Sequence, residues 1–125
     1  LELIEIKGPF KVCGIEVIPI EVLHGELPVL AFRIGNFAYV TDANYINGSN
    51  LKKLEGVETL VIGALRHNPH PTHFNVEQAL EIIEHLKPQK SYLTHIAHDI
   101  DHYPTNASLP KGIELAFDGL TFKTD

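Results

Sequence analysis

Residues 58–94 read ETLVIGALRHNPHPTHFNVEQALEIIEHLKPQKSYLT, and this stretch decides the fold. Its two ends, 58–63 and 91–94, are short and nearly all apolar, which is typical of buried strands of the parallel kind. Between them, residues 75–86 carry apolar side chains at helical spacing, and Asn75 is a favourable N-cap. The order strand, helix, strand therefore predicts an α/β unit.

The sequence predicts further strands and turns on both sides of this stretch. A two-residue linker that begins with glycine, Gly35-Asn36, is typical of a tight hairpin turn, and Asp118-Gly119 predicts a second turn. The predicted elements are strands at 2–6, 15–22, 29–34 and 37–41, a short helix at 49–54, and a closing hairpin of 113–117 and 120–122. Together they predict one mixed domain of the α/β or α+β class.

The composition is that of a globular domain. The chain has 125 residues, of which 44% are hydrophobic and 21% charged, so it has the material for one packed core. No apolar run approaches the roughly 18 to 20 residues that a membrane-spanning helix needs. The lone cysteine, Cys13, excludes an internal disulfide. We therefore expect residues 1–125 to form a single soluble domain in the cytoplasm, without a membrane partner.

The net charge of the chain bears on its possible partners. Ten basic and sixteen acidic residues give a net charge of −6, and no cluster of basic residues offsets it locally. This charge argues against nucleic acid as a partner.

The sequence contains no methionine and opens inside the alternating pattern of residues 2–6. We therefore expect the chain to be a piece of a longer protein.

Three side chains that can bind metals stand just past predicted strand ends. His24, Asp42 and His95 each follow a different strand. In open α/β sheets, ligands bind at the edge where strands end. Neutral imidazole suits zinc, manganese or iron, and a carboxylate can bridge two cations. Each residue by itself is more typical of a surface position or a turn, so the prediction of a metal site depends on all three.

A second group of histidines precedes the helix at 75–86. Residues 66–73 read RHNPHPTH, and their two prolines exclude a regular helix. Histidines on such a loop can hold a metal, donate a proton or contact an anion near a helix start. We expect His67 and His70 to be solvated.

A third group, HIAHDIDH at residues 95–102, allows two interpretations. If this segment is helical, His98 and His102 share one face and can chelate a structural zinc ion. Asp99 and Asp101 are equally typical of a solvated turn.

Taken in order, these residues resemble the C-terminal half of a metallo-β-lactamase-fold hydrolase. The matching segments are Leu23-His24-Gly25, Thr41-Asp42-Ala43-Asn44, His73-Phe74-Asn75, Leu93-Thr94-His95-Ile96-Ala97-His98-Asp99 and Phe117-Asp118-Gly119. Within that superfamily the chain is most similar to the branch that contains the phosphoribosyl cyclic phosphate phosphodiesterase of phosphonate breakdown, and ribonuclease Z is more distant.

The resemblance implies an αββα sandwich, in which this chain provides one mixed sheet with flanking helices. It implies two divalent metal ions, zinc or manganese, with His24 and His95 as ligands and Asp42 as the bridging carboxylate. His73 matches the histidine beside the scissile phosphate and is the implied catalytic residue. His98 is implied to lie at the site, as a substrate-binding or supporting residue. The His-x-His-x-Asp-His signature of the family is absent from these 125 residues and would lie upstream of Leu1.

The resemblance implies hydrolysis of a small phosphodiester, such as a cyclic phosphate, by a metal-activated water. The chain alone is expected to be inactive, because most metal ligands of the family are missing from it. One alternative is a non-catalytic half-domain that binds a partner through its sheet face. Another is a ribonuclease Z-like nuclease. We expect the sheet face to be covered by a second copy of the chain or by the missing N-terminal half.

Overall fold

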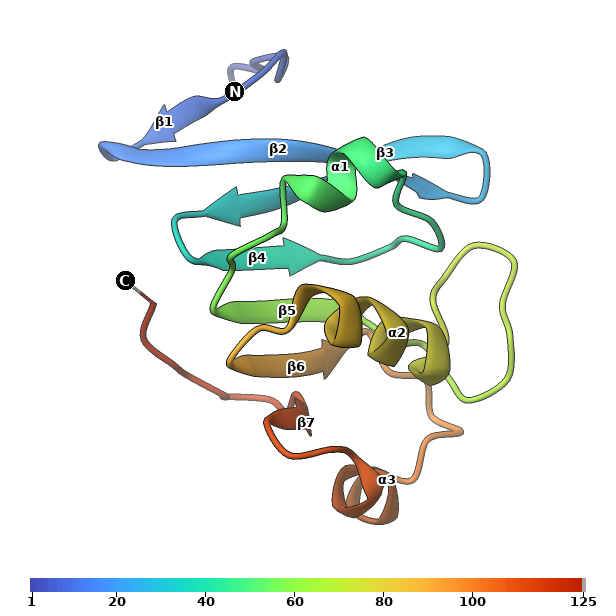
Figure 1. Cartoon of the computed structure of the whole chain (residues 1–125). Coiled ribbons are helices and arrows are strands. Elements are labelled where there is room, and N and C mark those ends of the chain that lie inside the picture. Colours follow the sequence, from blue (N-terminus) through green and yellow to red (C-terminus); the bar gives the residue numbers. More distant parts are fainter. Residues whose placement is uncertain (125) are drawn as a thin grey trace.

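The computed structural model describes residues 1–124 and contains a mixed seven-stranded sheet flanked by helices (Figure 1). The strands lie side by side in the order in which they occur along the chain. The elements are β1 (Phe10–Val12), β2 (Ile15–His24), β3 (Leu27–Ile34), β4 (Phe37–Val40), α1 (Gly48–Lys52), β5 (Thr59–Gly63), α2 (Val76–Leu86), β6 (Lys90–Thr94), α3 (His102–Ser108) and β7 (Ile113–Leu115). None of the helices within residues 1–124 has the length and apolar character that a membrane span requires.

The direction of the strands determines which loops lie together. Strands β1 to β4 pair antiparallel, whereas β4 to β7 pair parallel. Because two antiparallel pairings restore the original direction, β2 runs the same way as β4, and therefore the same way as β5 and β6. The C-terminal ends of these strands meet at one edge of the sheet, which is the edge where ligands bind in open α/β sheets.

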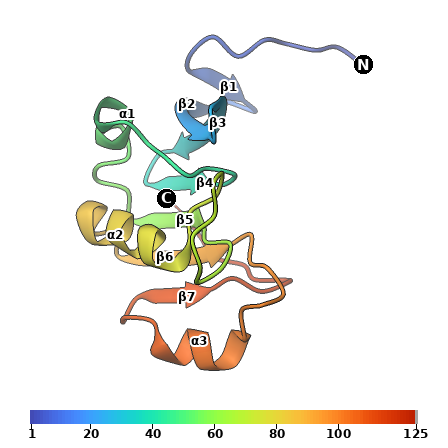
Figure 2. The same cartoon turned by 90° about the vertical axis from the view of Figure 1, so that its right-hand side faces the viewer.

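Helices α1 and α2 cover one face of the sheet, and the hydrophobic core lies under them (Figure 2). Leu60, Ile62 and Leu93 are fully buried in this core. The predicted N-cap of α2 is confirmed: the Asn75 side chain accepts from the Gln78 backbone N–H, and the Gln78 side chain accepts from the Asn75 N–H. A capping box of this kind stabilises a helix start by about 1 kcal/mol. It also fixes the end of the histidine-rich loop that leads into α2.

The opposite face of the sheet carries no helix of the described residues (Figure 2). The aromatic side chains of Phe37, Tyr39 and Tyr92 lie on this face. The C-terminal segment lies against part of it, because the ring of Phe122 stacks on Tyr92 at 5.0 Å between centroids and lies 5.7 Å from Phe37. Elsewhere the face is open, and Tyr39 is 40% exposed. We call this surface the open face.

Most of the predicted elements are confirmed, within one or two residues at their ends. These are the strands at 15–22, 29–34, 37–41, 58–63 and 91–94, the helices at 75–86 and 49–54, and the Gly35-Asn36 turn. The parallel pairing of the strands within 58–94 is also confirmed. Sequence patterns succeeded for the strands because β5 and β6 are mostly buried and β3 and β4 are joined by a two-residue turn. They succeeded for α2 because it has an apolar stripe behind a favourable N-cap.

Two predicted strands are wrong. Residues 2–6 form no strand and are exposed, because no described strand lies beside them to complete their hydrogen bonds. The closing hairpin is replaced by β7, which pairs parallel with β6 and buries Leu115. Residues 120–122 add no strand. The predicted turn is nevertheless present, since Leu120 N–H donates to the Phe117 carbonyl at 3.0 Å and Gly119 has a φ of 86°.

Candidate metal centre

The structure places the three predicted metal ligands at one edge of the sheet. His24 is the last residue of β2, Asp42 follows β4 after one intervening residue, and His95 directly follows β6. Because these strands run in the same direction, their ends bring together residues that are far apart in the sequence.

Two of these residues lie in strained backbone. Asp42 has a φ of 52° and His95 a φ of 57°, so both adopt the left-handed conformation. Aspartate and histidine tolerate this region better than most residues, yet it still costs of the order of 1 kcal/mol or more. Such conformations cluster at functional sites, where the surrounding structure holds them.

The loop after β4 forms hydrogen bonds with residues next to His24 and His73. The Asn44 backbone N–H donates to the Leu23 carbonyl at 2.8 Å, and the Asn44 side-chain oxygen accepts from the Gly25 N–H at 2.7 Å. Within the same loop, the Ala43 carbonyl accepts from the Phe74 N–H at 2.7 Å. One short segment therefore fixes the residues on both sides of His24 and the neighbour of His73.

The loops after β5 and β6 are joined in the same way. Ala64 N–H donates to the Thr94 carbonyl at 2.9 Å, and Ala97 N–H donates to the Leu65 carbonyl at 2.8 Å. Leu65 N–H in turn donates to the Phe74 carbonyl at 2.9 Å. Backbone hydrogen bonds thus connect His95 and His73 through the segment that follows β5.

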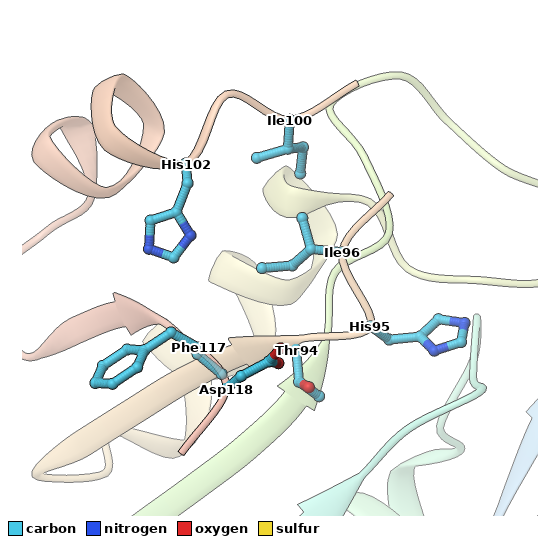
Figure 3. Close-up of a pocket in the computed structure, with 8 residues that line it drawn as sticks. Thr94, His95, Ile96, Ile100, His102, Phe117 and Asp118 are labelled. Atoms are coloured by element: carbon cyan, nitrogen blue, oxygen red, sulfur yellow. The ribbon is translucent and has the colours of Figure 1, made fainter. Parts of the chain in front are cut away.

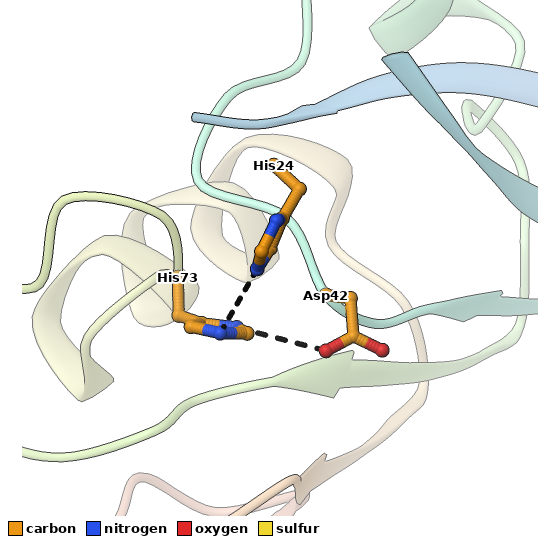
Figure 4. Close-up of side chains that lie close together, drawn as sticks. All are labelled: His24, Asp42 and His73. Atoms are coloured by element: carbon orange, nitrogen blue, oxygen red, sulfur yellow. Dashed lines mark hydrogen bonds and ion pairs between the residues drawn. The ribbon is translucent and has the colours of Figure 1, made fainter. Parts of the chain in front are cut away.

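His24, Asp42 and His73 form a compact cluster (Figure 4). Each offers one ligand atom, and these atoms all lie within 4.8 Å of one another. The Nε2 atoms of His24 and His73 are 3.1 Å apart, and His73 Nδ1 lies 3.8 Å from Asp42 Oδ1. His95 extends the cluster, because its Nε2 atom is 3.4 Å from the same Asp42 oxygen and its ring stacks on His73 at 4.9 Å.

These residues fit a divalent metal ion. Three imidazoles and one carboxylate are the donor set that zinc and manganese accept. Two nitrogens bound to one tetrahedral zinc ion at about 2.0 to 2.1 Å stand roughly 3.3 Å apart. The 3.1 Å between the His24 and His73 nitrogens is close to that separation. Asp42 lies between His73 and His95 and is placed to share its carboxylate.

His73 is the electrostatic centre of the cluster. Its pKa is lowered from the ordinary value of histidine, first by burial and then by the neighbouring His95 and His24, while Asp42 opposes the shift. Burial disfavours the charged imidazolium. His73 is therefore neutral near pH 7, which is the form that binds metals.

His70 lies closer to the cluster than predicted. The sequence indicated a solvated residue, but His70 is half-buried and its ring centroid is 5.1 Å from that of His73. Its Nδ1 atom accepts from the Thr72 N–H at 3.3 Å. The spacing HPTH was the available signal, since a turn at Pro71 brings the two histidines to the same side. His67 is exposed, as expected.

Of the two interpretations of residues 95–102, the solvated turn is confirmed and the helical pair of His98 and His102 is wrong. Helix α3 begins at His102 with Asp101 as N-cap, and His98 lies before it in an exposed turn. The two residues therefore do not share a helix face. No described hydrogen bond, ion pair or ring contact involves the His98 side chain. Its role at the site stays a prediction.

Comparisons with known proteins identify the family and the fold. Residues 1–96 match a family model described as the beta-lactamase superfamily domain. The chain is 41% identical to a diphosphatase of the PhnP family, whose crystal structure superposes with a TM-score of 0.92 over 94% of this chain and 47% of that chain. It is 35% identical over 127 residues to an octanoyltransferase from Porphyromonas gingivalis, covering 96% of this chain and 25% of that protein.

More distant structures share the fold. The metallo-beta-lactamase fold protein YhfI from Bacillus subtilis is 17% identical, with a TM-score of 0.73 over 90% of this chain and 51% of that chain. Human tRNase Z, short form, is 15% identical, with a TM-score of 0.67 over 89% of this chain and 42% of that chain. The chain thus spans about half the length of these solved structures and a quarter of the curated relative. Because the family model covers residues 1–96, the chain belongs to the beta-lactamase superfamily and has the α/β arrangement of a metallo-β-lactamase fold.

Proposed function

We propose that the protein acts as a metal-dependent hydrolase of phosphoester bonds, with a small phosphodiester such as a cyclic phosphate as its substrate. The observation that carries this proposal is the cluster at the sheet edge, where ligand atoms of His24, Asp42 and His73 lie within 4.8 Å and His95 is 3.4 Å from Asp42. The similarity to a diphosphatase at 41% identity favours phosphorus as the reacting centre.

The residues of the cluster have different roles in this proposal. Divalent cations held there would lower the pKa of a bound water and neutralise the charge of a phosphate. His24 and His95 are suited to ligate, and Asp42 to bridge. His73 is neutral near pH 7 in the metal-free chain, so it must first take up a proton and become an imidazolium before it can protonate the leaving oxygen. An approaching phosphate raises the proton affinity of this imidazole, because a nearby negative charge favours the imidazolium.

We propose that further ligands come from another part of the complete gene product. With His73 as the proton donor, the cluster offers two imidazoles and one carboxylate as ligands, whereas two cations with closed coordination need more donors. The sequence contains no His-x-His-x-Asp-His segment to supply them. The 125-residue chain by itself is therefore expected to be inactive and to bind metal weakly.

Acyl transfer fits this site less well. The name octanoyltransferase describes a protein of which this chain matches 25%. The lone cysteine, Cys13, lies in the turn between β1 and β2, at the end of β2 opposite to His24. An acyl-cysteine intermediate therefore cannot form at the cluster from the residues of this chain. A nuclease function is disfavoured by the net charge of −6.

The test compares hydrolysis of two ester classes by the complete gene product. The protein is stripped with a chelator, reloaded with zinc or manganese, and assayed with bis(p-nitrophenyl) phosphate, a ribose cyclic phosphate and p-nitrophenyl octanoate. We expect metal-dependent cleavage of the phosphodiesters and negligible cleavage of the carboxylic ester. Phosphodiester cleavage that survives chelation, or activity on the octanoate alone, would refute the proposal.

A further inference from the structure

The histidine-rich loop, residues 66–73, is neither helix nor strand, yet it holds the His73 ring beside His24. Two of its residues, Pro69 and Pro71, have no backbone N–H to donate. Backbone carbonyls that are shielded from water need a hydrogen-bond donor, and in a helix or a sheet the backbone supplies it. In this loop, side chains have to provide the donors instead.

Two side chains hold the carbonyls at the start of the loop. The Asn75 Nδ2 atom donates to the His67 carbonyl at 3.1 Å. The Arg66 guanidinium donates through Nε to the Asn68 carbonyl at 3.2 Å and through Nη2 to the Pro69 carbonyl at 2.8 Å. Three successive carbonyls of the loop are therefore bonded to side chains from its two ends.

The amide of Asn75 joins the loop to helix α2. Asn75 is 4% exposed, its side-chain oxygen accepts from the Gln78 N–H, and its side-chain nitrogen donates to the His67 carbonyl. An aspartate would cap the helix equally well, because capping needs only an acceptor oxygen. A carboxylate has no proton to donate at neutral pH, so it would not hold the loop.

The other end of the loop packs against the residue that follows His24. A Cβ atom on Gly25 would lie 3.1 Å from Thr72 Cγ2, so the loop and the turn after β2 are in close contact. Phe74, on the other side of His73, is hydrogen-bonded to the loop after β4. Thr72 is therefore the neighbour through which the histidine-rich loop controls the position of His73.

The rings that His73 meets are placed by strand ends. His95 turns its ring away from Phe117 and Asp118, which line a cavity past the end of β6 (Figure 3), and stacks on His73 at 4.9 Å. His24 is the last residue of β2, and its Nε2 atom is 3.1 Å from that of His73. Because both neighbours belong to the sheet, the approach of the third ring depends on the conformation of the loop.

We propose that Asn75 and Arg66 are positioning residues for His73, because they hold the histidine-rich loop in the conformation that places this imidazole beside His24 and Asp42. Both act through the loop backbone, since their side chains donate to the carbonyls of residues 67–69. The proposal rests on the proposed function in taking His73 as the proton donor to the leaving oxygen. A donor that is held in place before the substrate arrives lowers the entropic barrier to the reaction.

Two substrates with different leaving groups test this proposal in the metal-loaded complete gene product. p-Nitrophenolate leaves without a proton, whereas the sugar oxygen released from a ribose cyclic phosphate needs one. We expect Asn75→Asp to lower kcat on the cyclic phosphate roughly two- to tenfold, which corresponds to the loss of one hydrogen bond. The rate on bis(p-nitrophenyl) phosphate and the metal content should stay unchanged. A general loosening of the structure would instead lower both rates alike.

The variants separate the loop contacts from the helix cap. Asn75→Asp keeps the cap and removes only the donor to the loop. Arg66→Ala does not alter the cap and lies at a half-buried loop position, so it tests the same selective loss if the first variant folds poorly. Arg33→Ala is the matched control and should leave both rates unchanged. Arg33 also donates to backbone carbonyls, among them that of Gly35, at the end of β4 opposite to Asp42.

The contact between the two imidazoles provides a measurement without metal or catalysis. In the metal-free complete gene product, nuclear Overhauser effects between the His24 and His73 rings should weaken in Asn75→Asp and Arg66→Ala and persist in Arg33→Ala. Full ring contact in both loop variants, or rates that are unchanged or equally reduced on the two substrates, would overturn the inference and leave the proposed function standing. A wild-type protein that hydrolyses no phosphodiester would refute the proposed function, and the ring contact would still decide the positioning role.

Discussion

His24 and His73 approach each other to 3.1 Å between their Nε2 atoms although 49 residues separate them in the sequence. The loop after β4 contacts the neighbours of both: Asn44 accepts from the Gly25 N–H, and Ala43 accepts from the Phe74 N–H. The approach of the two imidazoles therefore depends on the loop after β4. This loop itself contributes one side chain to the cluster, Asp42.

Asn44→Ala should loosen this arrangement. The substitution leaves the half-buried Gly25 N–H without its acceptor, which costs about 1 to 3 kcal/mol of unfolding free energy. We expect lower stability in urea and weaker metal binding. Asn44→Asp retains the acceptor oxygen and should recover most of both. Asn68→Ala, at an exposed position, serves as the control, and an equal effect of both alanine variants would contradict the positioning role.

Asp42→Ala should remove metal from the complete gene product. A two-cation site binds about two divalent ions per chain, and loss of the shared carboxylate increases their mutual repulsion. Metal analysis by mass spectrometry is expected to show that at least one ion is lost. Asp99→Ala alters an exposed aspartate outside the cluster and should keep the full metal content. Undiminished two-ion binding by Asp42→Ala would exclude the bridging role.

His73→Ala distinguishes a proton donor from a metal ligand. If His73 protonates the leaving oxygen, turnover falls by roughly two to four orders of magnitude while the metal content stays intact. Loss of metal along with activity would make His73 a ligand, which its place in the cluster also allows. His85→Ala is the control, because His85 is exposed near the end of α2.

The sequence predicted the position of the cluster but not its full membership. His24, Asp42 and His95 were accessible to prediction because each lies at or just past the end of a strand, and strands of like direction end at one edge. His70 was missed although the spacing HPTH was an available signal, because the turn of the proline-rich loop that brings its ring within 5.1 Å of His73 was not predicted. The prediction of a closing hairpin was wrong because residues 113–115 pair in parallel with β6, which is buried. The turn residues, on which the hairpin prediction was based, do not indicate this pairing.

The lowered pKa of His73 predicts that stability depends on pH in the metal-free chain. In the unfolded chain this imidazole has a pKa of about 6.5, whereas burial keeps it lower in the folded state. Below about pH 6.5 the unfolded state therefore binds more protons than the folded state. The contribution of His73 to the unfolding free energy is fully present above that pH and is lost as the pH falls toward the folded pKa.

Urea unfolding in the presence of chelator, at about pH 8 and about pH 5, measures this dependence. We expect His73→Gln to reduce the loss of stability on acidification, because glutamine does not titrate. His85→Gln, on the exposed face of α2, should leave the loss unchanged. An unaltered pH dependence in His73→Gln would show that His73 titrates normally in the folded chain.

The open face predicts association of the 125-residue chain. Tyr39, Leu30 and Phe122 are exposed by 40%, 39% and 38%, and strand alternation places Leu30 and Tyr39 on this same face. Soluble monomers rarely leave a large contiguous apolar patch uncovered, so we expect two copies to pair through it when no other segment is present. Sedimentation velocity should show a dimer whose population grows with concentration. Tyr39→Glu should shift it toward monomer, because pairing would bury an uncompensated carboxylate, whereas Tyr103→Glu on α3 should not. A monomer at all concentrations would contradict this prediction, and so would equal effects of the two variants.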